Sequence, residues 1–359
     1  VGISLGHPIF ERSLLTARGD VWKQIRTIVS PTFSSGKMRK MQILIKDCVE
    51  RVDNKLETLA NSENNEIDIK KVFVNYTMDV IALCAFATKL QSHSGAEEHP
   101  FIHNASQFFR PTVRFGLFFI LNQLMPSIVK KYDISFLPKH YINYFKTTLE
   151  TIITERQSQK GPKNVDFLQL LIDAQNRTDT KDIDEDIRLE VQRISESMKK
   201  KGFQLQDMDI LATALLFVLA GYETTASTLS YLFHELALNP ESQHKLFEEI
   251  TKFGPNVEYE TIEKMPYLDA CISETLRLYS PLVMSQRIAS EDYDLGDTGL
   301  VVHKGMAVHI PLYAIHHDPQ YYPSPDRFIP DRFMPENKDR LIPYTYLPFG
   351  TGPRNCVGM

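Results

Sequence analysis

The sequence predicts a protein that is mainly α-helical with a small β region, on three observations. Residues 205–239 form the longest run of helical periodicity and end at an Asn-Pro pair, where a helix stops. Residues 35–60 and 66–90 carry apolar side chains at the spacing of amphipathic helices. Three short runs between residues 286 and 310, apolar and rich in β-branched residues, are typical of strands.

The first element in chain order is a short helix within residues 17–26, for which Asp20 is the expected N-cap. Trp22 and Arg26 lie four positions apart and so share one face of this helix. An indole N–H and a guanidinium on one face can bind the same anion. An ordinary half-buried tryptophan beside a surface arginine is the alternative.

The two helices that follow are expected to pack in the core. The apolar stripe of residues 35–60 consists of Met38, Met41, Ile45, Val49, Val52 and Leu56. Residues 100–137 are apolar and aromatic, and their run 115–121 is too short to span a bilayer. This run could lie at a membrane interface, cover an apolar pocket or belong to a core helix. The charged residues 176–202 indicate a solvated connection.

The long helix of residues 205–239 would span about 50 Å, enough to cross a domain. It contains the segment Ala220–Thr225, with sequence AGYETT. Glycine inside a helix costs about 1 kcal/mol relative to alanine, and a threonine hydroxyl can bond the carbonyl four residues back. Gly221, Glu223 and Thr224 therefore predict a place where the helix opens to admit a small ligand. A packing notch made of small residues is the alternative.

Residues 266–279 form the next helix, in which Glu274 and Arg277 lie three positions apart. By itself such a pair indicates a surface ion pair worth about 0.3 kcal/mol. Short strands are expected at Gln286–Ala289, Leu300–Val302 and Met306–Ile310. His316 is expected to have a structural role. Residues 319–347, rich in proline and tyrosine, predict a long irregular stretch of the kind that is usually functional.

The last stretch, Pro348–Gly358, places one cysteine in a loop rich in glycine and proline. A thiolate that binds a metal needs a fixed backbone, shielding from water and nearby donors. Gly350 and Gly352 allow positive φ angles and a close approach to a flat cofactor. Phe349 can cover the sulfur, and N–H groups after Cys356, at the start of a helix, can lower the pKa of its thiol. A small buried apolar residue is the alternative for a lone cysteine.

Composition excludes some classes of function. The 359 residues are 43% hydrophobic and 24% charged, which allows one large domain or two. A net charge of −5 gives no reason to expect a nucleic acid partner. The four cysteines are far apart in sequence, which fits a reducing compartment rather than a disulfide framework. We expect no stretch that spans a bilayer, because no apolar run approaches 18 residues.

The spacing Phe-x-x-Gly-x-x-x-Cys-x-Gly of residues 349–358 arises by chance about once in two thousand chains of this composition. The stretch resembles the haem-binding loop of the cytochrome P450 family. Trp22 with Arg26, Glu223-Thr224, and Glu274 with Arg277 occur in that family's order. The resemblance covers residues 10–359, and the stretch 165–175 is very similar to the microsomal family 3 drug-metabolising branch.

The resemblance implies one truncated cytochrome P450 domain over residues 1–359, with haem b between the long helix and the cysteine loop. Cys356 would be the proximal ligand of the iron, and Glu223 and Thr224 would deliver protons. Glu274, Arg277 and Arg332 would form a buried structural network. The residues implied as contacts of the cofactor are Trp22, Arg26, Ala220, Arg287, Phe349, Gly350, Arg354, Cys356 and Gly358.

The implied activity is insertion of one oxygen atom of O2 into a lipophilic substrate, either a xenobiotic or a steroid- or lipid-like molecule. Electrons would come from NADPH through NADPH–cytochrome P450 reductase, with cytochrome b5 as a second candidate partner. The expected location is the cytoplasmic face of the endoplasmic reticulum membrane. Two alternatives are a haem-thiolate isomerase or dehydratase acting on peroxides without a reductase, and a non-catalytic haem sensor or carrier. We also expect that the complete protein has further residues at both ends, including a membrane anchor.

Overall fold

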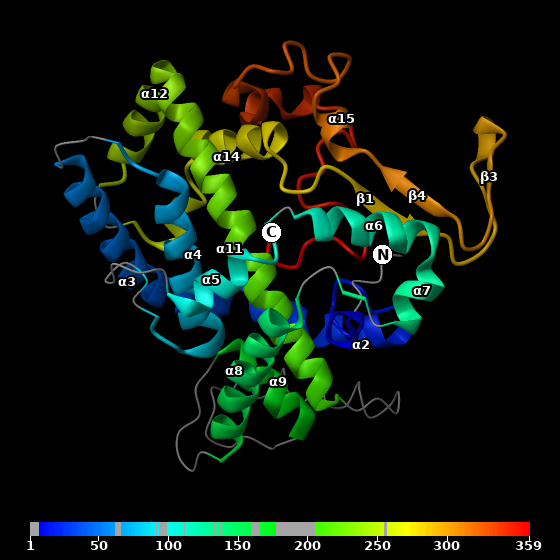
Figure 1. Ribbon diagram of the computed structural model, residues 1–359. Coiled ribbons are helices and arrows are strands. Elements are labelled where there is room, and N and C mark those ends of the chain that lie inside the picture. The colour runs from blue at the N-terminus through cyan, green and yellow to red at the C-terminus, as the bar shows by residue number, and fades with distance from the viewer. Residues whose placement is uncertain are drawn as a thin grey trace. The chain divides into compact units, whose positions relative to one another are not determined.

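The structure is a computed structural model that describes residues 7–61, 66–90, 92, 99–110, 112–132, 134–135, 138–158, 166–176, 205–254 and 257–359 (Figure 1). By its internal contacts the chain divides into two compact units. The N-terminal unit runs from Ile3 to Glu223, and the C-terminal unit from Thr224 to Met359. The charged segment predicted at 176–202 lies outside the described residues, apart from Asn176.

The N-terminal unit is helical throughout its described part. Its helices are α1 (Pro8–Glu11), α2 (Gly19–Val29), η1 (Ser30–Phe33), α3 (Ser35–Ala60), α4 (Ile69–Phe86), α5 (Pro100–Ser106), α6 (Val113–Leu124), α7 (Pro126–Lys131), α8 (Lys139–Ser158), α9 (Phe167–Asn176) and the first half of α11 (Asp207–Leu238). Helix α4 packs against α3 and α9, and α8 packs against α5 and α9. The expected helices at 35–60 and 66–90 are confirmed, the second with shorter bounds.

Aromatic rings fill the interior of the N-terminal unit. Phe145 of α8 meets Phe101 of α5 edge to face, with ring centroids 5.0 Å apart. Phe167, at the start of α9, stacks on Phe217 of α11 at 3.6 Å. Edge-to-face and offset ring pairs add about 0.5–1.5 kcal/mol each beyond the area that they bury. These contacts hold α5, α8, α9 and the first half of α11 together.

The start of α2 corrects one expectation. The N-cap is Arg18, which makes no side-chain capping bond, and not Asp20. Asp20 lies in the first turn instead, where its negative charge still favours the helix dipole. Gly19 has a φ of +54°, a conformation that is easy for glycine, and this sets the direction in which α2 begins.

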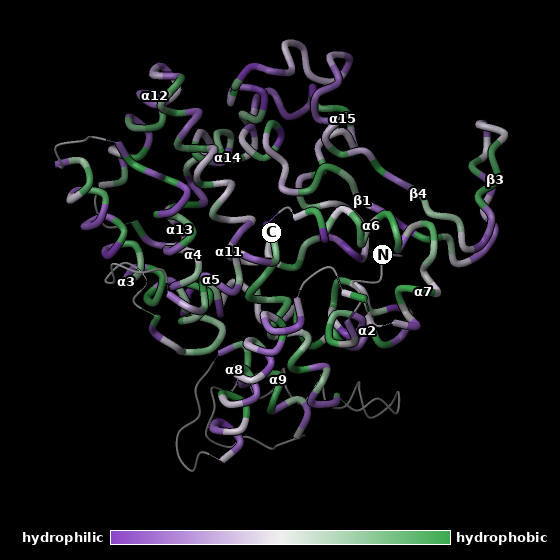
Figure 2. Tube along the Cα trace, in the orientation of Figure 1, coloured by the Kyte–Doolittle hydropathy of each residue, from purple (hydrophilic) through white to green (hydrophobic). Residues whose placement is uncertain are grey.

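Helices α6 and α7 carry apolar side chains on their surface rather than in a core. Val113, Leu117 and Leu124 of α6 are 82%, 62% and 72% exposed, while Phe118 is buried. Figure 2 shows the green, apolar stretches along this helix. Of the alternatives for run 115–121, a fully buried core helix is therefore wrong.

The C-terminal unit combines helices with two small sheets. Its elements are the second half of α11, α12 (Pro240–Thr251), α13 (Tyr259–Ile262), α14 (Pro266–Leu278), β1 (Ser285–Ile288), β2 (Tyr293–Asp294), η2 (Gly296–Thr298), β3 (Val301–Val302), β4 (Ala307–Ile310), α15 (Leu312–His316), η3 (Pro330–Phe333) and η4 (Pro335–Arg340). The mainly α class with a small β region is confirmed. Residues 319–347 are irregular as expected, except for the two short 3-10 helices η3 and η4.

Both sheets are antiparallel pairs. β1 pairs with β4 in the register Ser285↔Ile310 to Ile288↔Ala307. β2 pairs with β3, and this ribbon lies at the end of the long excursion between β1 and β4 (Figure 1). The three strand runs predicted from sequence are present as β1, β3 and β4, each within one or two residues of its predicted bounds.

Helix α14 is the centre of the C-terminal unit. It packs against α12, α15 and η3, and Cys271 and Ala270 on it are fully buried. Both carboxylate oxygens of Glu249, on α12, accept backbone N–H bonds from Tyr267 and Leu268 at 2.9 Å. These N–H groups are among the four that a helix leaves unsatisfied at its start. One glutamate of α12 thus caps α14 and sets its position.

Helix α11 corrects the expectation that no stretch could span a bilayer. By length and composition alone it is long and apolar enough to cross a membrane. Of its most apolar window, 56% is buried inside the protein. Core helices of soluble proteins pass the same test of length and hydropathy, so the length and hydropathy of α11 do not by themselves place it in a membrane.

Candidate functional site

The most buried polar group in the C-terminal unit is the pair Glu274 and Arg277 on α14. Both side chains have no exposed surface. Nε of Arg277 donates to one carboxylate oxygen of Glu274 at 2.8 Å, and Nη2 donates to the other at 2.9 Å. The surface ion pair that spacing alone indicated is wrong; the buried pair implied by the family resemblance is what the structure contains.

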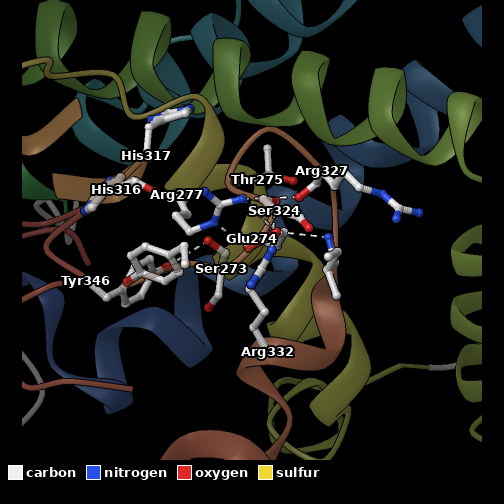
Figure 3. Close-up of polar contacts among 12 residues, drawn as sticks. Ser273, Glu274, Thr275, Arg277, His316, His317, Ser324, Arg327, Arg332 and Tyr346 are labelled. Atoms are coloured by element: carbon white, nitrogen blue, oxygen red, sulfur yellow. Dashed lines mark hydrogen bonds and ion pairs between the residues drawn. The ribbon is translucent and has the colours of Figure 1, made fainter. Parts of the chain in front are cut away.

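Arg332 of η3 reaches the same carboxylate from the other side. Its Nε donates to Glu274 at 3.3 Å, and its Nη2 donates to the carbonyls of Pro323 and Ser324. The N–H of Ile329 is a fourth donor to Glu274, at 2.9 Å. The carboxylate therefore ties α14 to η3 and to the irregular segment before it, as Figure 3 shows.

Arg277 also organises backbone outside its own helix. Nη1 donates to the carbonyl of His316 at 2.8 Å, and Nη2 to the carbonyl of Arg327 at 3.2 Å. Its guanidinium lies over the ring of Tyr322, 5.0 Å from the centroid. A buried charge that is paired and fully hydrogen-bonded is tolerated, while removing one partner strands the other.

His316, at the end of α15, links this network to the segment before the cysteine. Its side chain is fully buried, and Nε2 accepts the N–H of Leu347 at 2.9 Å. Burial, followed by the positive charge of Arg277, lowers the pKa of His316 to about 4. The ring is therefore neutral near pH 7, and a structural role for His316 is what the contacts show.

Two glycines at positive φ and one backbone hydrogen bond shape the cysteine loop. Gly350 and Gly352 have φ angles of +68° and +74°, which are strained for other residues. The N–H of Cys356 donates to the carbonyl of Phe349 at 2.9 Å, and this bond closes the loop. Cys356 itself is exposed, as is Gly358.

Two details describe the immediate surroundings of Cys356. Phe349 contacts the cysteine through its carbonyl oxygen, and its side chain is 38% exposed. Residues 357–358 form a turn. The carbonyl of Phe349 is thus the part of this residue that is hydrogen-bonded to Cys356.

The two other arginines expected at the cofactor are partly buried. Arg287 lies in β1, where Nη1 donates to the hydroxyl of Ser285 and the carbonyl of Gln286 at 2.8 and 2.9 Å. Arg354 lies in the cysteine loop, two residues before Cys356. Both belong to the C-terminal unit, together with Thr224, the buried network and the loop.

In the N-terminal unit, α4 packs against the AGYETT segment of α11. A Cβ added to Gly221 would lie 2.3 Å from Cδ1 of Ile81, closer than real side chains approach. The hydroxyl of Thr77 donates to the carbonyl of Tyr222 at 2.9 Å. Gly221 thus serves the packing of α4, so at this residue the structure favours the packing notch over a local opening.

Glu223, the fourth residue of that segment, accepts a 2.7 Å bond from Nζ of Lys70 on α4. The glutamate side chain is 20% exposed, and the lysine is 55% exposed. Sequence reasoning missed Lys70, Thr77 and Ile81, because they lie about 140–153 positions from their partners and nothing in their local pattern marks them.

The remaining predicted contacts also lie in the N-terminal unit. Trp22 and Arg26 are one turn apart on α2, and both are half-buried. Ala220 is exposed on α11. The predicted site residues are therefore divided between the two units: Trp22, Arg26, Ala220 and Glu223 lie in the N-terminal unit, and the others lie in the C-terminal unit.

The residues of the cysteine loop fit the haem that the resemblance implies. A Cβ added to Gly350 or Gly352 would meet no atom within 4 Å, so the backbone leaves open space on that side. An exposed thiol beside such a backbone suits a flat cofactor that a cysteine binds axially. In the described part of the chain, no cluster of three or more His, Cys, Asp or Glu residues forms a separate metal site.

Comparison with known proteins agrees with this arrangement. The family model described as "Cytochrome P450" matches residues 4–359. The chain is 37% identical to cytochrome P450 3A6 of Oryctolagus cuniculus, over 97% of this chain and 66% of the relative. It is 34% identical to cytochrome P450 3A7 of Homo sapiens, over 97% of this chain and 66% of the relative.

A third relative, cytochrome P450 3A56 of Fundulus heteroclitus, is 34% identical over 99% of this chain and 68% of its own length. The chain thus spans about two thirds of the curated relatives that it matches. On the family match and on these relatives, the chain belongs to the cytochrome P450 family, and it is of the family 3 type.

Proposed function

We propose that the complete protein is a haem-thiolate monooxygenase. It inserts one oxygen atom of O2 into lipophilic organic molecules, either xenobiotics or steroid- and lipid-like compounds. The observation that carries this proposal is the loop around Cys356, with its exposed thiol and its two glycines at positive φ. Family membership and relatives of the family 3 type support it.

Cys356 would hold the haem iron as its axial thiolate ligand. When bound, a thiolate-ligated haem supplies the oxidation chemistry, because the sulfur pushes electron density toward the metal and favours O–O cleavage. Phe349, Gly350, Arg354 and Gly358 would line the same loop. Trp22, Arg26 and Arg287 would bind the carboxylates at the edge of the porphyrin through N–H donors, and Ala220 would lie against its face.

Glu223 and Thr224 would hold and pass on protons at their carboxylate and hydroxyl oxygens. A carboxylate and a hydroxyl at adjacent positions can accept and pass on a proton, and such acid–base groups contribute about 10²–10⁴-fold in rate. The ion pair with Lys70 supports this assignment, because it holds one oxygen of Glu223 in a defined position. Water can replace a hydroxyl in part, so we expect a smaller loss when Thr224 alone is removed.

Electrons would come from NADPH through NADPH–cytochrome P450 reductase, with cytochrome b5 as a second candidate donor. The site of action would be the cytoplasmic face of the endoplasmic reticulum membrane. The exposed apolar side chains of α6 support contact with a membrane surface or a lipophilic substrate, since such patches mark interaction sites. The net charge of −5 gives no support for a nucleic acid partner.

The function is tested with the complete protein, its reductase and a panel of lipophilic compounds. NADPH consumption, hydrogen peroxide and oxidised product are measured together, with and without reductase. We expect product only when reductase is present, which separates the monooxygenase from an isomerase or dehydratase and from a haem carrier. Turnover without reductase, or no NADPH consumption with any compound, would contradict the proposal.

The role of Thr224 is tested in the same assay. Thr224→Ala should bind haem and substrate normally and release a larger share of NADPH electrons as hydrogen peroxide. Thr58→Ala is the matched control, because Thr58 lies exposed on α3 and bonds only the carbonyl of Asn54 among the contacts described. Full coupling of NADPH to product in the Thr224 variant would remove this residue from the proton path.

A further inference from the structure

His316 connects two parts of the C-terminal unit that are far apart in sequence, namely helix α14 and the segment that precedes the cysteine loop. Its backbone carbonyl accepts Nη1 of Arg277 at 2.8 Å. Its ring accepts the N–H of Leu347 at 2.9 Å. Figure 3 shows the histidine beside Arg277 and Tyr346, at the edge of the buried network. One residue therefore contacts both the Glu274 cluster and the segment that enters the cysteine loop.

The hydrogen bonds continue from Leu347 to the cysteine. The carbonyl of Leu347 accepts the N–H of Gly350 at 3.1 Å, in the first turn of the loop. The carbonyl of Phe349 accepts the N–H of Cys356 at 2.9 Å. A path of bonded groups thus runs from the carboxylate of Glu274 to the backbone of Cys356, and His316 is its only side chain between Arg277 and the loop among the bonds described.

The neighbouring tyrosine supports the same segment independently. The hydroxyl of Tyr346 donates to the carbonyl of Ser273 on α14 at 3.1 Å. Its ring lies 5.8 Å from that of His316. Tyr346 is therefore bonded to α14, and Leu347 is bonded to His316 at the end of α15. Together these two bonds fix the position of the backbone where it enters the cysteine loop.

The hydrogen bonds of the imidazole ring indicate which of its two nitrogens matters for the loop. Because Nε2 accepts a bond, the proton of the neutral ring lies on Nδ1. Nδ1 is buried and has no partner in the described part of the chain. An unsatisfied buried donor is unfavourable, and an apolar ring of similar size would avoid it. An apolar ring would, however, have no acceptor for the N–H of Leu347. The acceptor at Nε2 is therefore the property that distinguishes His316 from an apolar ring at this position.

We propose that His316 is a positioning residue for the cysteine loop. Its Nε2 holds the N–H of Leu347 and so sets where Cys356 presents its sulfur. The inference rests on the proposed function, in which Cys356 is the axial ligand. It goes beyond the Glu274, Arg277 and Arg332 network, because it assigns the bond that holds the N–H of Leu347, next to the loop, to one side-chain nitrogen.

Two amide variants of the complete protein separate the acceptor from mere packing. In His316→Gln the side-chain oxygen reaches the position of Nε2, whereas in His316→Asn it reaches only that of Nδ1. Both side chains are neutral amides, so the two variants differ only in how far the amide oxygen lies from the backbone. His317→Asn is the control, because His317 is the half-buried residue that caps α15 and its ring bonds the carbonyl of Tyr313 in that helix rather than the cysteine loop.

Three quantities are measured for each variant. These are the carbon monoxide spectrum of the reduced haem, the rate of haem loss to an acceptor protein, and hydrogen exchange of the Leu347 amide in the haem-free protein. We expect His316→Asn to lose haem about tenfold faster, the effect of one buried hydrogen bond. We also expect it to show a larger fraction of non-thiolate spectrum and faster exchange at Leu347. His316→Gln and His317→Asn should resemble the wild type.

Equal behaviour of His316→Asn and the wild type would overturn the proposal. So would a Gln variant that is as impaired as the Asn variant. If the Asn variant does not fold, the Gln variant decides: wild-type exchange at Leu347 and a thiolate spectrum support the proposal, and their loss overturns it. A wild-type protein without a thiolate spectrum would instead refute the proposed function, while exchange at Leu347 would still test the bond.

Discussion

Arg277 binds Glu274 through two N–H···O bonds of 2.8 and 2.9 Å, and neither side chain has any exposed surface. Both residues lie within one turn of α14, yet the other hydrogen-bond partners of their side chains all lie outside this helix. Glu274 receives Arg332 and the N–H of Ile329, and Arg277 gives bonds to two carbonyls. The pair therefore determines how the irregular segment folds against the helix.

Arg277→Ala should destabilise the protein much more than Arg332→Ala. The first change leaves Glu274 buried with half of its donors, which costs about 3–5 kcal/mol. Arg332 is 12% exposed and lies 3.3 Å from the carboxylate, so its loss should cost less. Chemical denaturation and haem content measure both effects.

Lys245→Ala is the control for the preceding comparison. Lys245 pairs with Asp331 at 3.2 Å, but both side chains are more than half exposed. A pair of this kind contributes about 0–1 kcal/mol. Equal losses for Arg277 and Lys245 would show that the buried cluster is no more important than a surface pair.

The stability of the protein should fall as pH decreases from about 6.5 to about 4, in part because of His316. Its pKa is lowered from 6.5 to about 4 by burial first and by the charge of Arg277 second. The unfolded chain takes up a proton at a pH where the folded ring still excludes it, so protons favour unfolding in this range. Two and a half pH units correspond to roughly 3 kcal/mol.

This pH dependence is checked by denaturation between pH 4 and 7 in the wild type and in His316→Gln. The groups that face the ring are Arg277, His317 and Tyr346, and none of them is changed in the variant. The variant should show a shallower slope over this range. An identical slope in both proteins would mean that His316 does not titrate as described.

Much of the fold could be predicted from sequence, because periodicity reports local structure. Helices at residues 35–60 and 205–239 appear as α3 and α11 within one or two residues. The start of α2 was predicted wrongly because Asp20 has the right chemistry for an N-cap, but Gly19 adopts a positive φ and the helix begins at Gly19, two residues earlier than a cap at Asp20 would place it. Caps depend on backbone geometry as well as on residue type.

The candidate site was only partly predictable for a different reason. The spacing around Cys356 and between Glu274 and Arg277 is local and can be recognised along the chain. The bonds from Lys70 to Glu223 and from Leu347 to His316 join residues that are 153 and 31 positions apart. Such contacts depend on how helices and loops pack, and no local pattern encodes them.

Gly221→Ala should destabilise the protein by about 1 kcal/mol. The new methyl group would meet Cδ1 of Ile81 at 2.3 Å. Overpacking costs about 1–3 kcal/mol, and the better helix propensity of alanine returns about 1 kcal/mol. The free energy of unfolding measures the balance. Ile81→Val removes the clashing carbon, so in that background Gly221→Ala should become neutral or stabilising.

Gly36→Ala is the matched control for the glycine experiment. Gly36 is also helical, in α3, and a Cβ there meets nothing within 4 Å. This change should stabilise the protein by about 0.5–1 kcal/mol. If both alanines have the same effect, or if Ile81→Val does not change the sign at Gly221, then α4 does not constrain this part of α11.

The carbon monoxide spectrum of the reduced complete protein tests the central claim most directly. We predict the long-wavelength band of thiolate-ligated haem in the wild type and in Cys84→Ser, since Cys84 lies half-buried in the N-terminal unit. Cys356→Ser should lose this band. A wild type without the band, or a Cys356→Ser variant that keeps it, would contradict the assignment of Cys356 as the haem ligand.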